Sequence, residues 1–164
     1  GFALATGISR DTFTTGNWAT ATGSQIYEDL RQQYAAIVAA SKGVWIPDTI
    51  ALPMKLKSIL TKPMVIGTTA LLTSVEQYIA QNLDCKILYT VRLNDIDKDG
   101  AAGNGAVAMY KKDNRVMRHV LPRGYYELGP QQVGRTLTVY ADGVSGGLVI
   151  PQPTACALWD GCVA

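Results

Sequence analysis

The residues most able to bind a metal ion lie in one acidic stretch of the chain. Asp95, Asp97 and Asp99 alternate with other residues, and Gly100 follows at the sixth position, as at the start of a calcium-binding EF-hand loop. The twelfth position, where such a loop needs a bidentate glutamate, is Ala106. Strand-like segments flank the stretch where an EF-hand has helices. The pattern therefore predicts a solvated turn without a metal ion.

Two further patterns lack the context that their chemistry needs. The segment from Gly103 to Ala108 fits G-x-G-x-x-A, but a dinucleotide-binding turn follows a strand and opens a helix. Here an acidic loop precedes the segment and a strand-like run follows it. His119 is the only histidine and has no serine or cysteine nearby in a recognisable nucleophile context. The glycine-rich segment from Gly143 to Gly147 is interpreted as a turn. The sequence thus predicts no catalytic residue, no cofactor, no metal site and no enzyme.

The basic and sulfur-containing residues favour structural roles. A loose basic cluster, interrupted by Asp113, is interpreted as a solvated face and not as a phosphate-binding site. Three cysteines form no C-x-x-C motif, and each lies more than thirty residues from the histidine, which predicts reduced structural thiols in a reducing compartment. The basic cluster comprises Lys111, Lys112, Arg115, Arg118 and Arg123, and the cysteines are Cys85, Cys156 and Cys162.

Composition predicts one ordered domain over residues 1–164. Hydrophobic residues make up 48% of the 164 residues and charged residues 17%, which argues against disorder. A formal net charge of +2 gives no electrostatic case for binding nucleic acid or an anionic membrane. No apolar run reaches the roughly 18 residues that a membrane span needs, and no signal-peptide pattern is present. The chain opens on Gly1 without an initiator methionine, as a processed or excised fragment would.

A long helix is expected from Gly23 to Ser41. Its apolar stripe recurs at helical spacing. Thr22 and Gln25 have capping-box spacing, and Gly43 is placed to end the helix. The stripe consists of Ile26, Leu30, Tyr34, Ile37 and Val38.

The stretch from Trp45 to Leu83 is expected to be the framework of the fold. Pro47 and Pro53 bound an extended segment, Thr49 to Leu52, because proline cannot donate to a strand ladder. Pro53 then opens a helical turn, and a second main helix is predicted from Gly67 to Leu83. The helical turn buries Leu56, Ile59 and Leu60, and the second helix has a stripe of Leu71, Leu72, Val75, Tyr78 and Ile79.

The remainder of the chain is predicted to form strands and loops. Residues Gly1 to Gly23 are interpreted as an irregular segment pinned by Phe2, Phe13 and Trp18. Helices that precede strands favour an α+β fold with two main helices packed on a mixed or antiparallel sheet with long loops. The expected strands are Lys86–Leu93, a hairpin of Val107–Tyr110 with Val116–Leu121, Leu137–Tyr140, Leu148–Ile150 and Thr154–Asp160.

An ordered set of short segments resembles the C-terminal part of the tailed-phage major capsid proteins. Each segment is weak alone, but their order and spacing match over nearly the whole chain. The segments are Ile26–Leu30, Pro47–Pro53, Gly67–Thr69 before a helix, Met109–Asp113, Val116–Pro122 and Gly146–Pro153, with Trp159 and Asp160 shortly before the end.

The resemblance implies the Johnson fold and a structural role in an icosahedral capsid shell that assembles around the packaged genome. It implies that the chain is the axial domain plus the returning C-terminal strands. The N-terminal arm, the extended hairpin loop and the spine helix of the family would precede residue 1. The implied partner is the protein itself, in pentamers and hexamers of a virion assembled in the bacterial cytoplasm, while the fragment alone could remain monomeric. No membrane and no sequence-specific nucleic acid are implied, and no crosslinking residue matches.

One alternative comes from another class of function. The acidic, glycine-rich loop from Asn94 to Gly105 could make the chain a small binding module for calcium or another ligand. A melting temperature that rises with calcium would favour this alternative.

Overall fold

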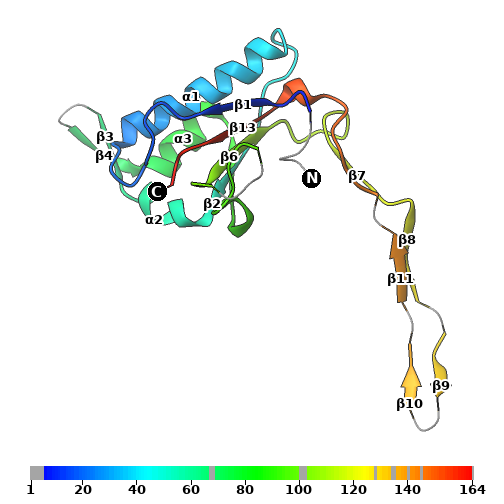
Figure 1. Cartoon of the computed structure of the whole chain (residues 1–164). Coiled ribbons are helices and arrows are strands. Elements are labelled where there is room, and N and C mark those ends of the chain that lie inside the picture. The colour runs from blue at the N-terminus through cyan, green and yellow to red at the C-terminus, as the bar shows by residue number, and fades with distance from the viewer. Residues whose placement is uncertain are drawn as a thin grey trace.

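Strands from both ends of the chain form the central sheet. The computed structural model describes residues 6–66, 69–99, 103–127, 129–133, 136–139, 141–144 and 146–163. The order in the sheet is β1 (Ser9–Thr12), β13 (Cys156–Asp160), β6 (Ala106–Tyr110), β2 (Thr49–Pro53) and β5 (Lys86–Thr90). β1 is parallel to β13 and β2 is parallel to β5, whereas β6 is antiparallel to both of its neighbours. With helices on one face, this mixed sheet confirms the α+β prediction (Figure 1).

Helix α1 (Gly23–Ala40) confirms the first predicted helix to within one residue. Thr22 and Gln25 form the predicted capping box, in which each side chain binds the other residue's backbone amide. At the other end, the Gly43 amide donates to the Val38 carbonyl over 2.8 Å, which closes a Schellman motif. Lys42 and Gly43 both have positive φ, 52° and 78°, so the glycine lies one position beyond the first left-handed residue.

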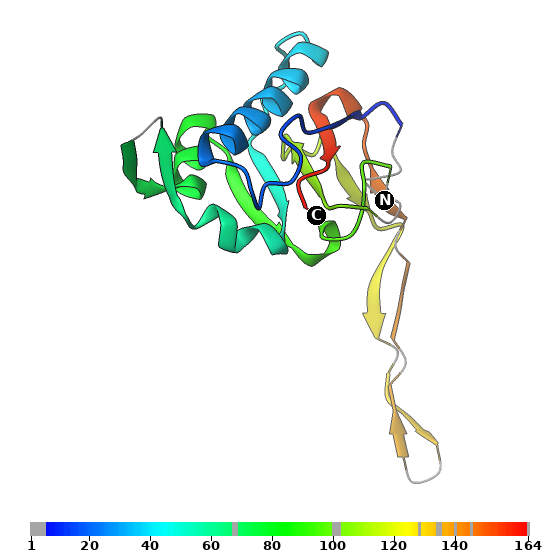
Figure 2. The same ribbon diagram turned by 60° about the vertical axis from the view of Figure 1, so that its left-hand side comes forward.

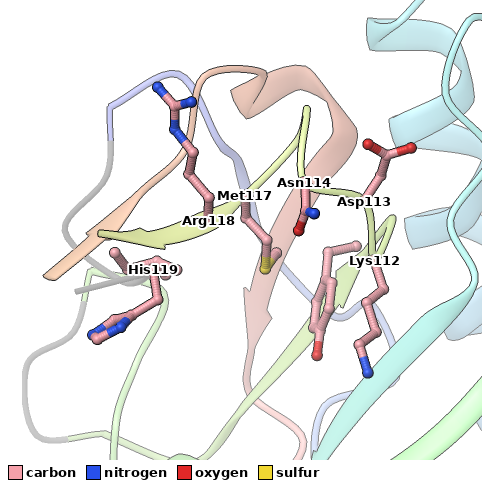
Figure 3. A pocket seen from close by; sticks show the side chains of 8 residues that line it. Lys112, Asp113, Asn114, Met117, Arg118 and His119 are labelled. Carbon is pink, nitrogen blue, oxygen red and sulfur yellow. The ribbon is translucent and has the colours of Figure 1, made fainter. Parts of the chain in front are cut away.

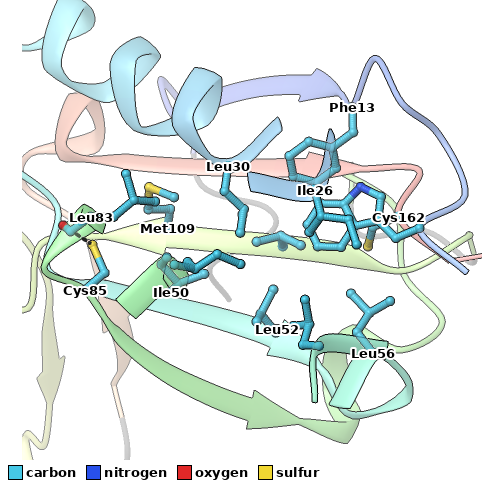
Figure 4. Close-up of a cluster of buried hydrophobic side chains, with 14 of the residues drawn as sticks. Phe13, Ile26, Leu30, Ile50, Leu52, Leu56, Leu83, Cys85, Met109 and Cys162 are labelled. Carbon is cyan, nitrogen blue, oxygen red and sulfur yellow. Dashed lines mark hydrogen bonds between the residues drawn. The ribbon is translucent and has the colours of Figure 1, made fainter. Parts of the chain in front are cut away.

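The main core lies between α1 and the face of the sheet that the helix covers (Figure 4). Ile26, Leu30 and Ile37 are at most 1% exposed and form the buried stripe of the helix. Ile50 and Met109, on neighbouring central strands, are fully buried in the same cluster. Burial of each such side chain stabilises the fold by roughly 1.5–3 kcal/mol relative to exposure.

The opposite face of the sheet is covered by loops and carries smaller residues. Ala106 and Ala108 of β6 are buried there beside Leu158 of β13. Leu93 and Val116, from segments that flank β6 in the chain, pack against them. Short side chains on this face let short turns and loops lie close to the strands.

The second main helix is shorter than predicted. Thr69–Ser74 forms strand β4, which pairs antiparallel with β3 (Pro63–Ile66), and only Val75–Leu83 is helical, as α3. Ser74 caps α3 through its own capping box with Gln77, so the helix cannot extend back through Leu71 and Leu72. The predicted start at Gly67 and Thr68 lies outside the described residues. The buried positions Val75 and Ile79 are confirmed.

Helix α3 meets the start of α1 at a residue without a side chain. The Met64 sulfur and a Val75 methyl carbon each approach within 2.8 Å of where a side chain on Gly23 would begin. Both of these residues are buried. Glycine at this helix start therefore lets β3, α3 and α1 pack together.

The connections around Pro53 and after β5 are short helical turns. Pro53 is followed by η2 (Met54–Leu56) and α2 (Lys57–Leu60), with Leu56 and Leu60 buried as predicted. The predicted strand from Lys86 to Leu93 ends at Thr90, and η3 (Val91–Leu93) follows it. The Thr90 hydroxyl accepts a hydrogen bond from the Arg92 amide and so starts this turn.

The N-terminal segment is more regular than predicted. Ser9–Thr12 forms β1, which pairs with β13 from the other end of the chain, whereas an irregular segment was expected. The anchors Phe13 and Trp18 are confirmed, at 3% and 0% exposure, and Phe2 lies outside the described residues. Buried Asp29 of α1 accepts hydrogen bonds from the Trp18 indole nitrogen and the Thr15 hydroxyl. These contacts fix the segment across α1.

A long antiparallel ribbon, called here the arm, stands away from the body (Figures 1 and 2). Each of its three strand pairs joins an outgoing segment to a returning one, so the arm spans residues 118–149. The pairs are β7 (Arg118–Val120) with β12 (Gly147–Val149), β8 (Arg123–Glu127) with β11 (Ala141–Val144), and β9 (Gln131–Val133) with β10 (Thr136–Thr138).

The arm replaces the predicted hairpin of Val107–Tyr110 with Val116–Leu121. β6 pairs instead with β13 and β2, and β7 pairs with β12. The Asp113 carbonyl accepts hydrogen bonds from the Val116 and Met117 amides, at 2.9 Å each, and this turn directs the chain out of the body. The predicted strands Leu137–Tyr140 and Leu148–Ile150 overlap β10 and β12, while Tyr140 lies outside the described residues.

Candidate functional site

The three aspartates of the EF-hand-like stretch bind three different partners. Asp95 pairs with the Lys55 ammonium at 2.6 Å, and Asp99 pairs with the Arg10 guanidinium at 3.1 Å. The Asp97 carboxylate accepts a hydrogen bond from the Asp99 amide. The stretch thus ties η2 at one side of the sheet to β1 at the other. This arrangement agrees with a structural turn, and the absence of a metal ion stays a prediction.

Asp160, at the end of β13, fastens the same loop to the sheet. Its carboxylate accepts hydrogen bonds from the Thr12 hydroxyl at 2.6 Å and the Lys98 amide at 3.2 Å, and the Lys98 ammonium lies 3.5 Å away. Burial alone would raise the pKa of Asp160, but these hydrogen bonds and the lysine charge outweigh it and hold the pKa below its usual value. The ionised carboxylate therefore stabilises the folded chain.

A hollow of about 570 Å³ lies where the arm leaves the body (Figure 3). His119 on β7 lies opposite Leu148 on β12 and is exposed at this junction. No serine or cysteine is among the described residues that line the hollow, so none can act there as a nucleophile with His119 as base. The lining residues are Tyr110, Lys112, Asp113, Asn114, Met117, Arg118, His119 and Leu148.

The structure divides the basic cluster into separate contacts. The Lys111 ammonium pairs with Asp48 at 2.9 Å, and this contact raises the pKa of Lys111. Arg115 pairs with Asp113, holding the pKa of that carboxyl at about 2, and its guanidinium stacks over the Trp45 ring at 5.3 Å. These contacts surround the turn from which the arm departs. They stabilise the arm root and pair two of the five cations with local carboxylates, while Lys112 and Arg118 are exposed at the hollow.

The three thiols lie in the interior of the body. Cys85, Cys156 and Cys162 are buried and form no disulfide with one another. Burial raises the pKa of Cys85 to about 11 and the pKa values of Cys156 and Cys162 to about 12. A thiol with so high a pKa is a poor nucleophile at neutral pH, which agrees with the prediction of structural cysteines.

The arm is the structural feature that reasoning from the sequence missed. Its described strands pair only with one another, and a two-stranded ribbon is marginally stable by itself in water. Apolar side chains along it are exposed, from 38% at Leu148 to 61% at Leu121. Valine and leucine residues on both sides of the segment 124–143 were the available signal, but they do not reveal which segments pair. The described strands of the arm therefore have exposed edges and exposed apolar side chains.

Comparisons with known proteins place this arrangement among capsid structures. Residues 4–162 match the family model for the major capsid protein. The structure resembles the capsid of Myoviridae phage XM1 at a TM-score of 0.78 and 20% identity, covering 97% of this chain and 53% of that chain. It also resembles a virus-like particle from Pyrococcus furiosus, at a TM-score of 0.65 and 16% identity. That match covers 97% of this chain and 58% of the other. No curated protein matches the sequence.

The likeness extends to structures of more distant sequence. A structure of Gordonia phage Cozz gives a TM-score of 0.54 at 13% identity, covering 98% of this chain and 51% of that chain. The chain spans little more than half the length of these structures. At such identities the likeness shows the fold, which is the Johnson fold of capsid subunits. Among the described residues, no helix combines the length and apolarity needed to cross a bilayer.

Proposed function

This chain belongs to the major capsid protein family, and on that premise we propose that it forms part of a subunit that assembles with copies of itself into a phage or prophage capsid. The observation that carries the proposal is the body with its arm, whose structure is matched over 97% of the chain by the capsid of phage XM1. A shell subunit needs a rigid core and extended contact surfaces, and both are present. In the hollow at the arm root, no serine or cysteine is among the described lining residues beside His119.

The body corresponds in this proposal to the axial domain, and the arm to the returning C-terminal strands. Two capsid-like chains of the same fold are matched over only 53% and 58% of their own length, so a longer subunit would add residues to the part described here. Ile8 at the start of β1 packs in the same cluster as Ile150, at the root of the arm. A segment that enters before Ile8 in a longer subunit is therefore close to the open edges of the arm and could cover them.

The proposed partners are other copies of the subunit, arranged in pentamers and hexamers. The shell would enclose the genome without reading its sequence, because the chain has near-neutral charge and two cations of its basic cluster, Lys111 and Arg115, are paired with local carboxylates. The proposed location is the virion, assembled in the cytoplasm of a bacterial host.

Expression of the full-length subunit that carries this chain tests the proposal. Purified protein is expected to sediment as large particles, and negative-stain electron microscopy is expected to show closed shells or rings. The matched control is the same subunit with Val75→Asp, which disrupts the core and should abolish particles together with folding. A folded wild-type subunit that stays monomeric over a range of protein and salt concentrations would refute the proposal.

A further inference from the structure

The central sheet has two open edges on opposite sides of the body. β1 pairs only with β13 and β5 pairs only with β2 among the described strands. The pairing directions show that β1 and β5 run the same way, because two antiparallel steps separate them. A copy that is displaced along the sheet and rotated by a modest angle therefore presents its β1 beside β5 of the first copy with the strands parallel.

The surface along β5 is basic with an apolar centre. Four exposed cations belong to it, while the carboxylates of Glu76, Asp84 and Asp95 are the anions nearby. Leu88, Val91 and Met54 add apolar area and are 37%, 65% and 41% exposed. The cations are Lys55, Lys57, Lys86 and Arg92. We call this surface the β5 edge.

The surface along β1 is acidic. Four carboxylates lie along β1, at the end of β13 and in the acidic loop. Two of them form ion pairs, Asp99 with Arg10 and Asp160 with Lys98. A hollow of about 430 Å³ opens among Thr12, Asp97 and Asp160, and its acidic lining suits the end of a lysine or arginine side chain. The carboxylates are Asp11, Asp97, Asp99 and Asp160. We call this surface the β1 edge.

We propose that the β5 edge of one copy docks against the β1 edge of the next copy. This inference rests on the proposed shell function. The contact is heterologous, since two different surfaces meet, and such a contact generates a ring when its rotation closes. Opposite charges set the direction of docking, and the apolar centre of the β5 edge supplies buried area.

A second copy fits the observations better than nucleic acid does. Nucleic acid would use the cations of the β5 edge but would leave its exposed apolar residues without a partner. It would also be repelled by the acidic β1 edge. A copy of the same chain accounts for both edges at once, because each copy carries one of each.

Charge reversal in the full-length subunit tests the contact. One variant carries Lys86→Glu and Arg92→Glu, a second carries Asp11→Lys and Asp99→Lys, and a third combines all four changes. Lys86, Arg92, Asp11 and Asp99 are exposed, so circular dichroism should show folding like wild type. A control with Lys42→Glu and Lys112→Glu changes the net charge as the first variant does but lies outside both edges.

Either edge variant alone should lower the yield of particles at least about tenfold, as judged by sedimentation, and the combined variant should return it to within about twofold of wild type. The control should assemble like wild type.

Unchanged assembly of both edge variants, or failure of the combined variant to recover, would overturn the docking proposal while wild-type shells still support the proposed function. A wild-type subunit that never assembles would overturn both. A Lys86 and Arg92 variant that forms normal shells but retains less DNA would identify nucleic acid as the partner and refute docking.

Discussion

At the scale of residues, the carboxylates in unusual environments hold segments together. Buried Asp29 accepts a hydrogen bond from the Trp18 indole at 2.8 Å and fixes the N-terminal segment on α1. Asp48 accepts from the Lys112 amide at 2.8 Å and pairs with Lys111, fixing the arm root. Asp160 joins β13 to the acidic loop. Each of these groups binds donors from another segment of the chain, which agrees with a structural role.

Asp160→Asn should reduce stability most at neutral pH. The folded-state pKa of Asp160 is lowered, so its ionised form adds stability above the unfolded pKa of about 3.8, and that stability is lost as pH falls through the folded pKa. The unfolding free energy of wild type should therefore exceed that of the variant at pH 7. The difference should begin to shrink when the pH falls below about 4 and should be smaller at pH 3. Urea unfolding at pH 7, 5 and 3 measures this. A difference that stays constant over this range would contradict the assignment.

The residue types of the acidic stretch could be recognised in the sequence, but their partners could not. Lys55 lies forty positions before Asp95, and Arg10 lies eighty-nine positions before Asp99. No local pattern connects such residues, because the fold alone brings them together. Ala106 was the informative signal, because it stands at the twelfth position, where a calcium-binding loop needs a bidentate glutamate.

At the scale of elements, those whose signals are local were predicted and those that depend on distant pairing were not. α1 carries its own apolar period and its own capping box, so both ends were predicted to within one residue. α3 has a second capping box at Ser74 and Gln77 that was overlooked, and the leucines before it suit a strand as well as a helix. β1 pairs with a strand more than 140 positions away, so nothing in its four residues could reveal it.

Val75→Asp should prevent folding. Val75 is 2% exposed at the start of α3 and touches the position of Gly23 in α1, so a carboxylate there would be buried without a partner. The expected loss of at least about 4 kcal/mol is a large share of the stability of a domain this size. Loss of the cooperative thermal transition in circular dichroism measures it. Asp97→Ala, in the solvated loop, is the control and should melt like wild type. A Val75→Asp protein with unchanged melting would show that this packing is wrong.

At the scale of the whole molecule, a stable body carries an arm that adds little to the core. Among the described residues, no member of either buried cluster lies between residues 121 and 146. The body should therefore fold without the distal arm, while assembly should require it. The division into body and arm could not be predicted from the sequence, because the returning strands are separated from their partners by the whole arm.

Excision of residues 121–146 tests this division. Val120 and Gly147 are direct partners in the ladder, so an Asn-Gly turn can join them as a two-residue hairpin. The shortened chain should melt cooperatively within about 5 °C of the original, since no described core residue is removed. The same excision in the full-length subunit should abolish shells. A shortened chain that fails to fold would show that the arm stabilises the body.

The place of β13 in the sheet also sets the time at which the body can close. This strand lies between β1 and β6, yet it leaves the ribosome after every other described strand. At about 5–20 residues per second, β1 waits roughly 7–30 seconds for its neighbour, and β6 keeps one open side until then. A nascent chain therefore cannot complete the β1 edge before translation reaches Asp160. Unfinished chains lack one of the two surfaces proposed to join copies, which would keep them out of a growing ring.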